Sequence, residues 1–577
     1  MKRWLKYASP YKKYFILGPL CMIVEVIGEA LMPKLMSTVI NGYNEGTLTV
    51  ANSIGTAVLM LFIALIMLLG GVGGAYFGAK ASVNFAADVR RDVYGQIQKF
   101  SFSNIDRFST GSLVTRLTND VTQLQNFVNM LLRMALRAPG MMIGGLIMAI
   151  LIKPSLSVVF AVSVPLMLVT IGVIIRIGFP RFRIMQTKID KLNSTVQESV
   201  TNIRVVKSFV REDRENEKFS NANGELKKSG LSAVGTVIFM QPIMTLFMNA
   251  TILGVIWFGH KIVIGGGMQI GDLSAFITYV TQILTSIMMV TMLLMISSRA
   301  LASANRISEV LDEKIDLTDD GAAYKDREIA NGEIEFNNVS FRYYKNSEES
   351  VLNNINLKIP PHSTVGIIGS TGCGKTTLVS MIPRLYDADE GEILIDGVNV
   401  RDYSLYHLRE GVGMVLQKNV LFSGTIEDNL RWGDENASID EVRSAAETAQ
   451  ADRFVTSFKD GYDTDLGQGG SNVSGGQKQR LCIARALLKK PKILILDDST
   501  SAVDTATERN IREAFASELR DTTKIIIAQR ISSVMHADMI VVMDDGKITG
   551  VGTHDELLAS NAEYQEIYYS QMDREEA

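Results

Sequence analysis

Six long apolar segments in the first half of this 577-residue chain constrain its fold more than any other feature. A helix needs about 20 mostly apolar residues to cross a membrane, because the hydrocarbon interior offers no partners for polar backbone groups. The six segments lie near residues 14–40, 54–80, 127–152, 155–178, 233–263 and 272–298. The sequence therefore predicts an all-α membrane domain of six spanning helices over residues 1–311.

Two polar stretches, near residues 81–126 and 179–230, separate successive apolar segments. Their charged residues recur at helical spacing, which is too regular for loops, and the stretches are too polar to lie in lipid. We therefore expect the helices to continue well beyond the bilayer.

Lysine and arginine indicate the orientation of the chain in the membrane. They cluster before the first span, from Lys2 to Lys13, and after the second, from Arg90 to Arg116, whereas the connection 41–53 has none. Because cytoplasmic segments carry an excess of these residues, the N-terminus is expected in the cytoplasm. An even number of spans returns the second half of the chain there, as in a multi-pass protein of a bacterial plasma membrane.

The pattern changes after the last span. Residues 312–332 are polar and acidic and are interpreted as a linker. From Glu333 onward the apolar runs shorten to strand length and alternate with helical patterns, which is typical of an α/β domain. We therefore predict a second domain over residues 333–577.

A phosphate-binding motif begins this second domain. Residues 369–376 match G-x-x-x-x-G-K-[ST], after a strand pattern and before a helical one, as the motif requires. The glycines let backbone N–H groups surround phosphate oxygens. Lys375 would reach the β- and γ-phosphates and Thr376 the Mg²⁺, so the sequence predicts ATP and Mg²⁺ as cofactors.

Two further motifs belong with the phosphate loop. An apolar run at residues 493–496 ends in Asp497, which would hold Mg²⁺, and Asp498, where a carboxylate would polarise the attacking water. Ser474-Gly475-Gly476-Gln477 precedes a helical pattern, and exposed glycines at a helix N-terminus favour anion binding.

With these motifs the chain resembles an ABC exporter half-transporter, in which a six-helix membrane domain precedes one ABC ATPase domain with a helical subdomain around the signature. The resemblance implies that Tyr343 stacks on adenine, that Gln417 of the Q-loop contacts Mg²⁺ and that Asp504 belongs to the D-loop. The implied nucleotide-binding residues are Tyr343, Gly369, Ser370, Thr371, Gly372, Cys373, Gly374, Lys375, Thr376, Thr377, Gln417 and Asp497. The implied Mg²⁺ ligands are Thr376, Gln417 and Asp497.

The catalytic pair expected from this resemblance is altered. Asp498 stands where the family usually carries glutamate, and Gln529 where it usually carries histidine. Aspartate is one methylene shorter than glutamate, and a displacement of about 1 Å can cost about 100-fold in rate. Gln468 and Gly469 also replace two charged residues that usually precede the signature.

The resemblance also implies a second chain. ABC domains dimerise head to tail, so each ATP site takes its phosphate loop from one chain and its signature from the other. This chain alters its own catalytic pair but keeps the signature Ser474–Gln477. We therefore expect one subunit of a heterodimeric ATP-driven exporter, with hydrolysis mainly at the site shared with a partner half-transporter. A slow homodimeric exporter and an ATP-binding regulatory or gating subunit remain alternatives.

Two segments resemble the cytoplasmic loops that couple the domains in this family. They lie near residues 103–116 and 202–211, and both are expected to contact ATPase domains. The first contains a helix-breaking cluster at 109–112, which suits a short transverse helix.

Two carboxylates lie inside the first span. Glu25 and Glu29 are four residues apart, so they share one helix face deep in the bilayer. Such groups are costly in lipid. They mark either a cavity that attracts a cationic amphiphile, or pairing with Arg133 or Arg137 of the third span or with polar groups on a neighbouring helix.

Composition limits the partners and the redox chemistry. A net charge of −4 gives no general affinity for nucleic acid, and 47% hydrophobic residues agree with membrane lipid as surroundings. Hydrophobic or amphiphilic compounds, such as drugs or lipids, are the expected substrates. The three cysteines form no disulfide framework, and Cys373, in the phosphate loop, is expected to be exposed and reactive.

Overall fold

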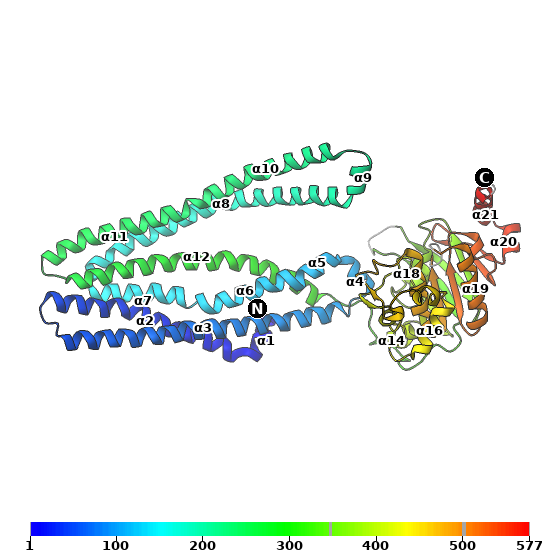
Figure 1. The fold of residues 1–577 in the computed structure, drawn as a ribbon, viewed down its shortest axis with the longest axis horizontal. Coiled ribbons are helices and arrows are strands. Elements are labelled where there is room, and N and C mark those ends of the chain that lie inside the picture. Colours follow the sequence, from blue (N-terminus) through cyan, green and yellow to red (C-terminus); the bar gives the residue numbers. More distant parts are fainter. Residues whose placement is uncertain (1, 345–348, 499–502, 576–577) are drawn as a thin grey trace. The chain divides into compact units, whose positions relative to one another are not determined.

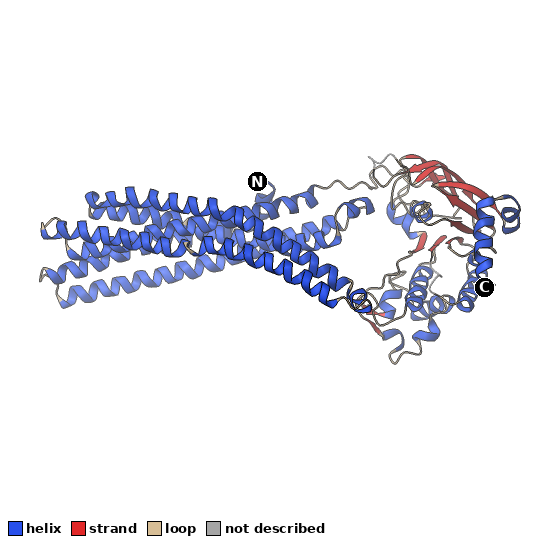
Figure 2. Ribbon diagram, turned by 90° about the horizontal axis from the view of Figure 1, so that it is seen from above, coloured by secondary structure: helices blue, strands red, loops and turns tan. Residues whose placement is uncertain are grey.

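The computed structural model describes residues 2–344, 349–498 and 503–575, which form two compact units. Unit 1 comprises Met1–Ile97 and Gly111–Asp312, and unit 2 comprises Gln98–Thr110 and Glu313–Ala577. Figure 2 shows that unit 1 is helical and that the long strands belong to the second half of the chain. The short segment 98–110 therefore packs with unit 2, although its sequence neighbours belong to unit 1.

Unit 1 is built from long helices. Its elements are α1 (Lys2–Ala8), α2 (Lys12–Asn44), α3 (Val50–Ile97), α5 (Thr110–Thr115), α6 (Val121–Met134), α7 (Arg137–Ile152), α8 (Pro154–Thr201), α9 (Ile203–Ser208), α10 (Glu212–Ile238), α11 (Met240–Ile264) and α12 (Ile270–Asp312). Within the described residues six stretches are long and apolar enough to cross a membrane, and each contains one of the predicted spans. The six-helix membrane domain is confirmed.

The helices also extend beyond the bilayer, as expected. α3 and α8 each contain 48 residues. At about 1.5 Å per residue each measures about 72 Å, more than twice the ~30 Å hydrocarbon core. Within unit 1, α8 and α10 form a hairpin that diverges from α12 toward the short helix α9 at its tip (Figure 1).

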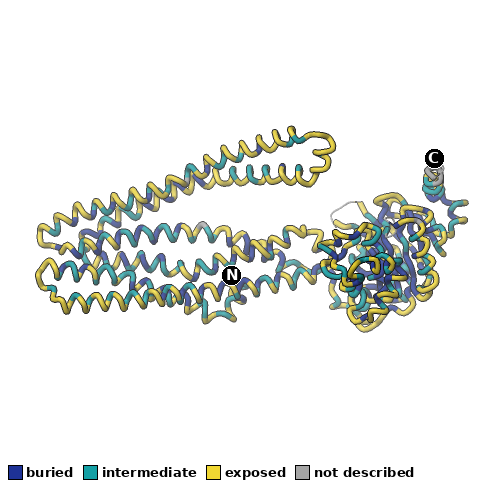
Figure 3. Tube along the Cα trace, in the orientation of Figure 1, coloured by how far each residue is buried: buried dark blue, intermediate teal, exposed yellow. Residues whose placement is uncertain are grey.

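Many residues of the membrane helices are exposed, in contrast to the buried interior of unit 2 (Figure 3). Large apolar residues are among them. Leu61 and Leu69 of α3 and Val162 of α8 are examples. A lipid environment removes the cost that such exposure would have in water.

Unit 2 is an α/β domain around a six-stranded sheet of order β12-β11-β3-β10-β9-β6. The strands of this sheet are β3 (Thr364–Gly369), β6 (Val412–Val415), β9 (Ile493–Asp497), β10 (Thr523–Ile527), β11 (Met539–Asp544) and β12 (Lys547–Gly552). All except β12 run parallel, and every residue of β9 is buried. Because parallel strands end at one edge, the segments after β3, β9 and β10 meet there.

A second, antiparallel sheet of order β2-β1-β4-β5 packs against the same core. It contains β1 (Ile334–Phe341), β2 (Leu352–Ile359), β4 (Glu390–Ile395) and β5 (Val398–Asn399), and a short pair joins β7 (Gly424–Thr425) to β8 (Asp465–Leu466). The helices of unit 2 are α4 (Phe102–Arg107), α13 (Lys375–Ser380), α14 (Leu405–Glu410), α15 (Ile426–Leu430), α16 (Ile439–Thr448), α17 (Asp452–Val455), α18 (Gly475–Leu488), α19 (Thr505–Glu518), α20 (His554–Ser560) and α21 (Ala562–Glu575). Helices α15 to α18 surround a separate apolar core.

The acidic segment before β1 also packs on unit 2. Leu317 and Ile329 are buried, and the backbone N–H of Tyr324 donates to the carbonyl of Asp402 at 2.8 Å.

Candidate functional site: a phosphate loop with an altered catalytic pair

The phosphate loop, residues 369–376, joins β3 to α13 and depends on three glycines. Gly369, Gly372 and Gly374 have φ values of 156°, 89° and 97°. A Cβ at Gly369 would lie 2.0 Å from the carbonyl oxygen of Met543, and one at Gly374 would lie 2.9 Å from that of Val351. Only glycine fits these two positions, so the loop can turn its backbone N–H groups toward an anion.

Lys375 folds back over the loop. Its Nζ donates to the carbonyl oxygens of Gly369 at 2.8 Å and Ser370 at 2.7 Å. Ser370 is itself fixed by donating from Oγ to Asp544 at 3.0 Å. The only positive charge contributed by residues 369–376 is thus held at the rim of the glycine turn, where phosphate oxygens would be stabilised.

Asp497 ends β9 beside Thr376. Its side chain is 2% exposed, and its Oδ2 has no hydrogen-bond partner within the described part of the chain. Burial above all, and then the charge of Asp498, raise the pKa of Asp497, whereas a hydrogen bond from Thr376 lowers it. An oxygen ligand without a partner, next to a hydroxyl, suits Mg²⁺, so these residues fit the cation that ATP brings.

The two altered residues, Asp498 and Gln529, are bonded to each other. Gln529 Nε2 donates to Asp498 Oδ2 at 2.9 Å. They meet because β9 and β10 end side by side, with Asp497 opposite Ile527. Burial raises the pKa of Asp498, which a bond with Gln417 lowers. The carboxylate is therefore held by two amide side chains.

The backbone of Asp498 is constrained as well. Its φ is 48°, in the left-handed region, and its N–H donates to the carbonyl of Ile527 at 3.0 Å. Gln479 of α18, which is 1% exposed, donates to the carbonyl of Asp498 at 3.3 Å. The sequence analysis did not single out Gln479. The signal available there was a polar residue among the apolar positions of the helix that follows the signature.

Tyr343 follows β1 and reaches the phosphate-loop helix. Its hydroxyl lies 2.9 Å from Thr377 Oγ1, and the residue as a whole is 42% exposed. The ring is thus accessible for stacking while its hydroxyl is tethered beside the phosphate loop.

The signature residues begin α18. Ser474 caps the helix, because the N–H of Gln477 donates to its Oγ at 3.4 Å and Gln477 Oε1 accepts from the N–H of Ser474 at 2.8 Å. Gly475 is exposed. Among the described residues no hydrogen bond joins Ser474–Gln477 to Gly369–Thr377. The structure thus groups the phosphate loop, Asp497, Asp498 and Gln529, but not the signature.

Asp504 has a local structural role. Its side chain caps α19 by accepting from the N–H of Thr507 at 3.0 Å, which lowers the pKa of Asp504. The preceding D-loop residues 501–502 lie outside the described part of the chain.

The expectation that Cys373 is exposed is wrong. Its side chain is only 4% exposed and packs into the apolar core beneath the loop, with Lys375 Nζ 3.6 Å from its Sγ. The loop turns its backbone outward, so the side chain at this position faces inward.

We therefore expect a maleimide to modify Cys373 slowly in the folded chain, with or without MgATP, and rapidly after denaturation. Mass spectrometry of the labelled peptides measures this, with buried Cys482 as the internal control. Fast labelling that MgATP suppresses would instead place the thiol at the nucleotide surface.

In unit 1 the two intramembrane carboxylates share one arginine. Arg137 Nη2 lies 3.1 Å from Glu25 Oε1 and 2.6 Å from Glu29 Oε1. The pairing interpretation is confirmed for Arg137, and attraction for a cationic amphiphile stays a prediction.

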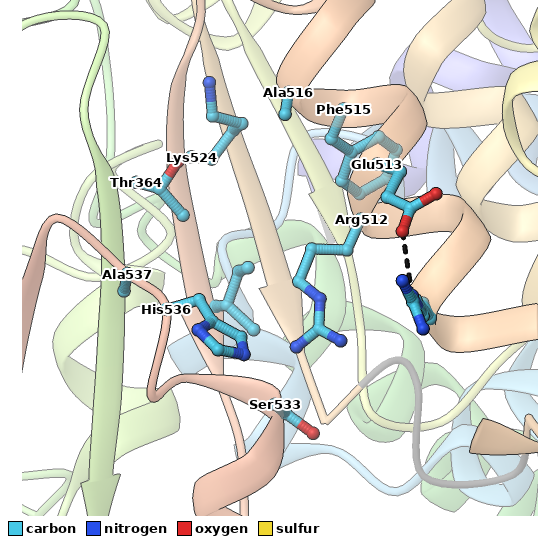
Figure 4. Close-up of a pocket in the computed structure, with 11 residues that line it drawn as sticks. Thr364, Arg512, Glu513, Phe515, Ala516, Lys524, Ser533, His536 and Ala537 are labelled. Carbon is cyan, nitrogen blue, oxygen red and sulfur yellow. Dashed lines mark hydrogen bonds and ion pairs between the residues drawn. The ribbon is translucent and has the colours of Figure 1, made fainter. Parts of the chain in front are cut away.

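A separate pocket lies between α19 and β10, where Arg512, Lys524 and His536 surround it (Figure 4). Arg509, also in its lining, is paired with Glu513 at 2.8 Å. None of the predicted nucleotide-binding residues lines this pocket.

Two family profiles match the chain. The profile described as the ABC transporter transmembrane region matches residues 15–288, and the profile described as ABC transporter matches residues 352–501.

Whole-length relatives agree with these profiles. The chain is 39% identical to the uncharacterized ABC transporter ATP-binding protein YfiB of Bacillus subtilis, over 100% of this chain and 99% of that one. It is 34% identical to YgaD of the same organism, named for multidrug export, over 98% of each. A solved bacterial Atm1-family ABC exporter with ATP bound is similar at a TM-score of 0.79 and 25% identity, covering 97% of this chain and 98% of that chain.

Proposed function

The chain belongs to the ABC transporter family, as a multi-pass protein of the bacterial plasma membrane with an ATP-hydrolysing domain, and we propose that it is the degenerate-site subunit of a heterodimeric exporter. The bond from Gln529 to Asp498 carries this proposal. It ties the two altered residues to each other at the position where water would be activated.

The residues that hold ATP are retained. Lys375 and the glycine turn would bind the phosphates, Tyr343 the base, and Thr376 with Asp497 the Mg²⁺. A cation held there would supply neutralisation of the phosphate charge. Gln417, which bonds Asp498, would complete the cation's ligands.

Hydrolysis at this site is expected to be slow. Asp498 is short, and its Oδ2 accepts from Gln529, so the carboxylate is directed toward the amide. A general base needs hydrogen-bond reach to its water. Glutamine also lacks the ring nitrogen through which histidine can carry a proton at neutral pH.

The intact signature points to a second chain. Ser474 and the glycines of α18 form a capped helix start in a subdomain with its own core. We infer that it acts on the γ-phosphate in the partner's site, where turnover would be concentrated.

Helix α9 supports a two-chain assembly. It has no buried residue, and Phe209 and Val210 beside it are 72% and 79% exposed. This apolar tip is cytoplasmic, where water makes its exposure costly. Contact with an ATPase domain of the second chain would cover it, as the sequence leads us to expect of residues 202–211.

The proposed cargo is a hydrophobic or amphiphilic compound, such as a drug or a lipid, moved out of the cytoplasm or the inner leaflet. The name of YgaD supports this class. Glu25 and Glu29 both pair with Arg137, so the membrane helices contain a cluster of charged groups.

Two other functions explain the altered pair. A homodimer would have two slow sites, and a regulatory or gating subunit would bind ATP without pumping. A neighbouring gene encoding a similar chain with glutamate and histidine at the two positions would favour the heterodimer. Transport assays on the co-purified pair would separate pumping from gating.

We expect the chain purified alone to bind MgATP but hydrolyse it slowly. MgATP should raise its melting temperature, because binding only to the folded state stabilises it. Lys375→Ala should remove most of that rise, whereas Lys547→Ala, on β12, serves as a charge-matched control. Thermal shift and phosphate release measure both properties.

Turnover by the isolated chain as fast as that of a consensus ABC homodimer would contradict the degenerate-site assignment. Lack of any MgATP stabilisation would contradict ATP binding itself.

A further inference from the structure

Tyr386 lies between the adenine-stacking position and α4. Its ring is edge-on to that of Tyr343, with centroids 5.2 Å apart and planes at 88°. Its ring centroid also lies 6.0 Å from that of Phe102, which begins α4. All these residues belong to unit 2.

Hydrogen bonds continue the row of ring contacts, from Tyr386 to α4 and from Tyr343 to the phosphate-loop helix. The hydroxyl of Tyr386 donates to Asp106 Oδ2 of α4 at 3.0 Å. Burial, followed by the neighbouring Asp106, raises the pKa of Tyr386, so the phenol keeps its proton and stays the donor. At the other end Tyr343 meets Thr377 of the phosphate-loop helix through their hydroxyls at 2.9 Å.

Polar contacts join α4 to the segment after α12. Asn104 Nδ2 donates to the carbonyl of Lys314 at 2.9 Å, and Arg107 pairs with Glu313 at 2.9 Å. α4 itself is stabilised by a capping box between Ser101 and Asn104. Tyr386 therefore gives this cytoplasmic helix a contact with the nucleotide side of unit 2.

We propose that Tyr386 is a positioning residue that couples occupancy of the adenine position at Tyr343 to the docking of α4 through its bond with Asp106. The inference rests on the proposed binding of ATP at Tyr343. A base stacked on Tyr343 fixes that ring, and the edge-on contact then fixes Tyr386 in the orientation that Asp106 accepts.

The coupling has a reciprocal consequence. If MgATP strengthens the docking of α4 by some factor, loosening α4 must weaken MgATP binding by the same factor. Removing the phenol hydroxyl should therefore act on both sides, although that hydroxyl touches neither the base position nor the phosphate loop.

The test is hydrogen exchange of residues 101–108 in the full-length chain, with and without saturating MgATP, together with MgATP affinity. In the unsubstituted chain MgATP should slow exchange there by about 5-fold or more, the lower range of common couplings. Tyr386→Phe and Asp106→Ala should each remove most of this slowing and weaken MgATP binding by a matching factor, because alanine leaves the phenol no side-chain acceptor. The double variant should behave like either single one, because both delete the same bond.

Tyr403→Phe is the matched control. It also deletes one tyrosine hydroxyl bond in unit 2, here a buried one to the carbonyl of Ile395 at 3.0 Å. It should lower stability without changing the response of residues 101–108. An unchanged response in Tyr386→Phe, or additive losses in the double variant, would overturn the inference. If MgATP bound but did not slow exchange of residues 101–108, only this inference would be overturned. If MgATP did not bind at all, the proposed function would be overturned as well.

Discussion

Replacing Gly475 by glutamate in the assembled two-chain transporter is expected to abolish most ATP turnover, whereas Lys375→Ala should leave most of it. Gly475 is exposed in the first turn of α18, where helix N–H groups supply positive potential. A carboxylate there would face the γ-phosphate of the partner's competent site. Loss of one preorganised donor to developing charge costs about 100- to 1,000-fold in rate, and an added negative charge should cost at least as much.

In the proposed heterodimer Lys375 would act instead on this chain's own slow site. Its removal should release the nucleotide retained there while most turnover continues at the partner's site. ATPase rate and trapped nucleotide in the purified pair, measured for each variant, distinguish the two sites. If Lys375→Ala abolished turnover and Gly475→Glu spared it, the assignment of sites would be reversed.

A matched pair of cap variants controls for helix stability. Ser474 caps α18, and Ser438 caps α16 with the same kind of box. Each serine-to-alanine change should cost about 1 kcal/mol of helix stability. Only Ser474→Ala should also slow turnover, because only α18 begins with the signature.

The six spans and the phosphate loop were predictable because each depends on sequence-local chemistry. An apolar run of membrane length has few alternatives, and the spacing of Gly369, Gly374 and Lys375 matches a loop whose glycines are sterically required. Asp498 and Gln529 were singled out through the family resemblance, and their effect on hydrolysis stays a prediction.

What the sequence could not predict depends on contacts between distant segments. The bond from Gln529 to Asp498 requires β9 and β10 to be neighbours, an order set by the whole sheet. Cys373 faces the core because of the loop's backbone, not because of its motif position. Tyr386 carries no motif, and its role is visible only when α4 packs against it.

The intramembrane charges show the same limit. Helical spacing placed Glu25 and Glu29 on one face, but two arginines were equally available as partners. In the structure both carboxylates pair with Arg137 of α7, whose guanidinium lies within 3.1 Å of each.

Restoring the pair, Asp498→Glu with Gln529→His, is expected to raise hydrolysis at this chain's own site by up to about 100-fold. Glutamate extends the carboxylate by one methylene, and histidine replaces the amide that now donates to Asp498 at 2.9 Å. Each single change should achieve less. Glutamate alone would still be held by Gln529, and histidine alone would face a carboxylate that remains too short, so the two effects should be more than additive.

The measurement requires the partner's phosphate loop to be silenced by its own lysine-to-alanine change, so that only this site is counted. The added Lys375→Ala change should return the restored variant to baseline, which confirms the source of the activity. The burial that raises the pKa of Asp498 would act on a glutamate at the same place. The pKa of that glutamate would therefore lie closer to the pH at which a general base works best. If the double variant hydrolysed no faster than the unsubstituted chain, the slow step would lie outside these two residues, and the bond between them could not be the cause of the asymmetry.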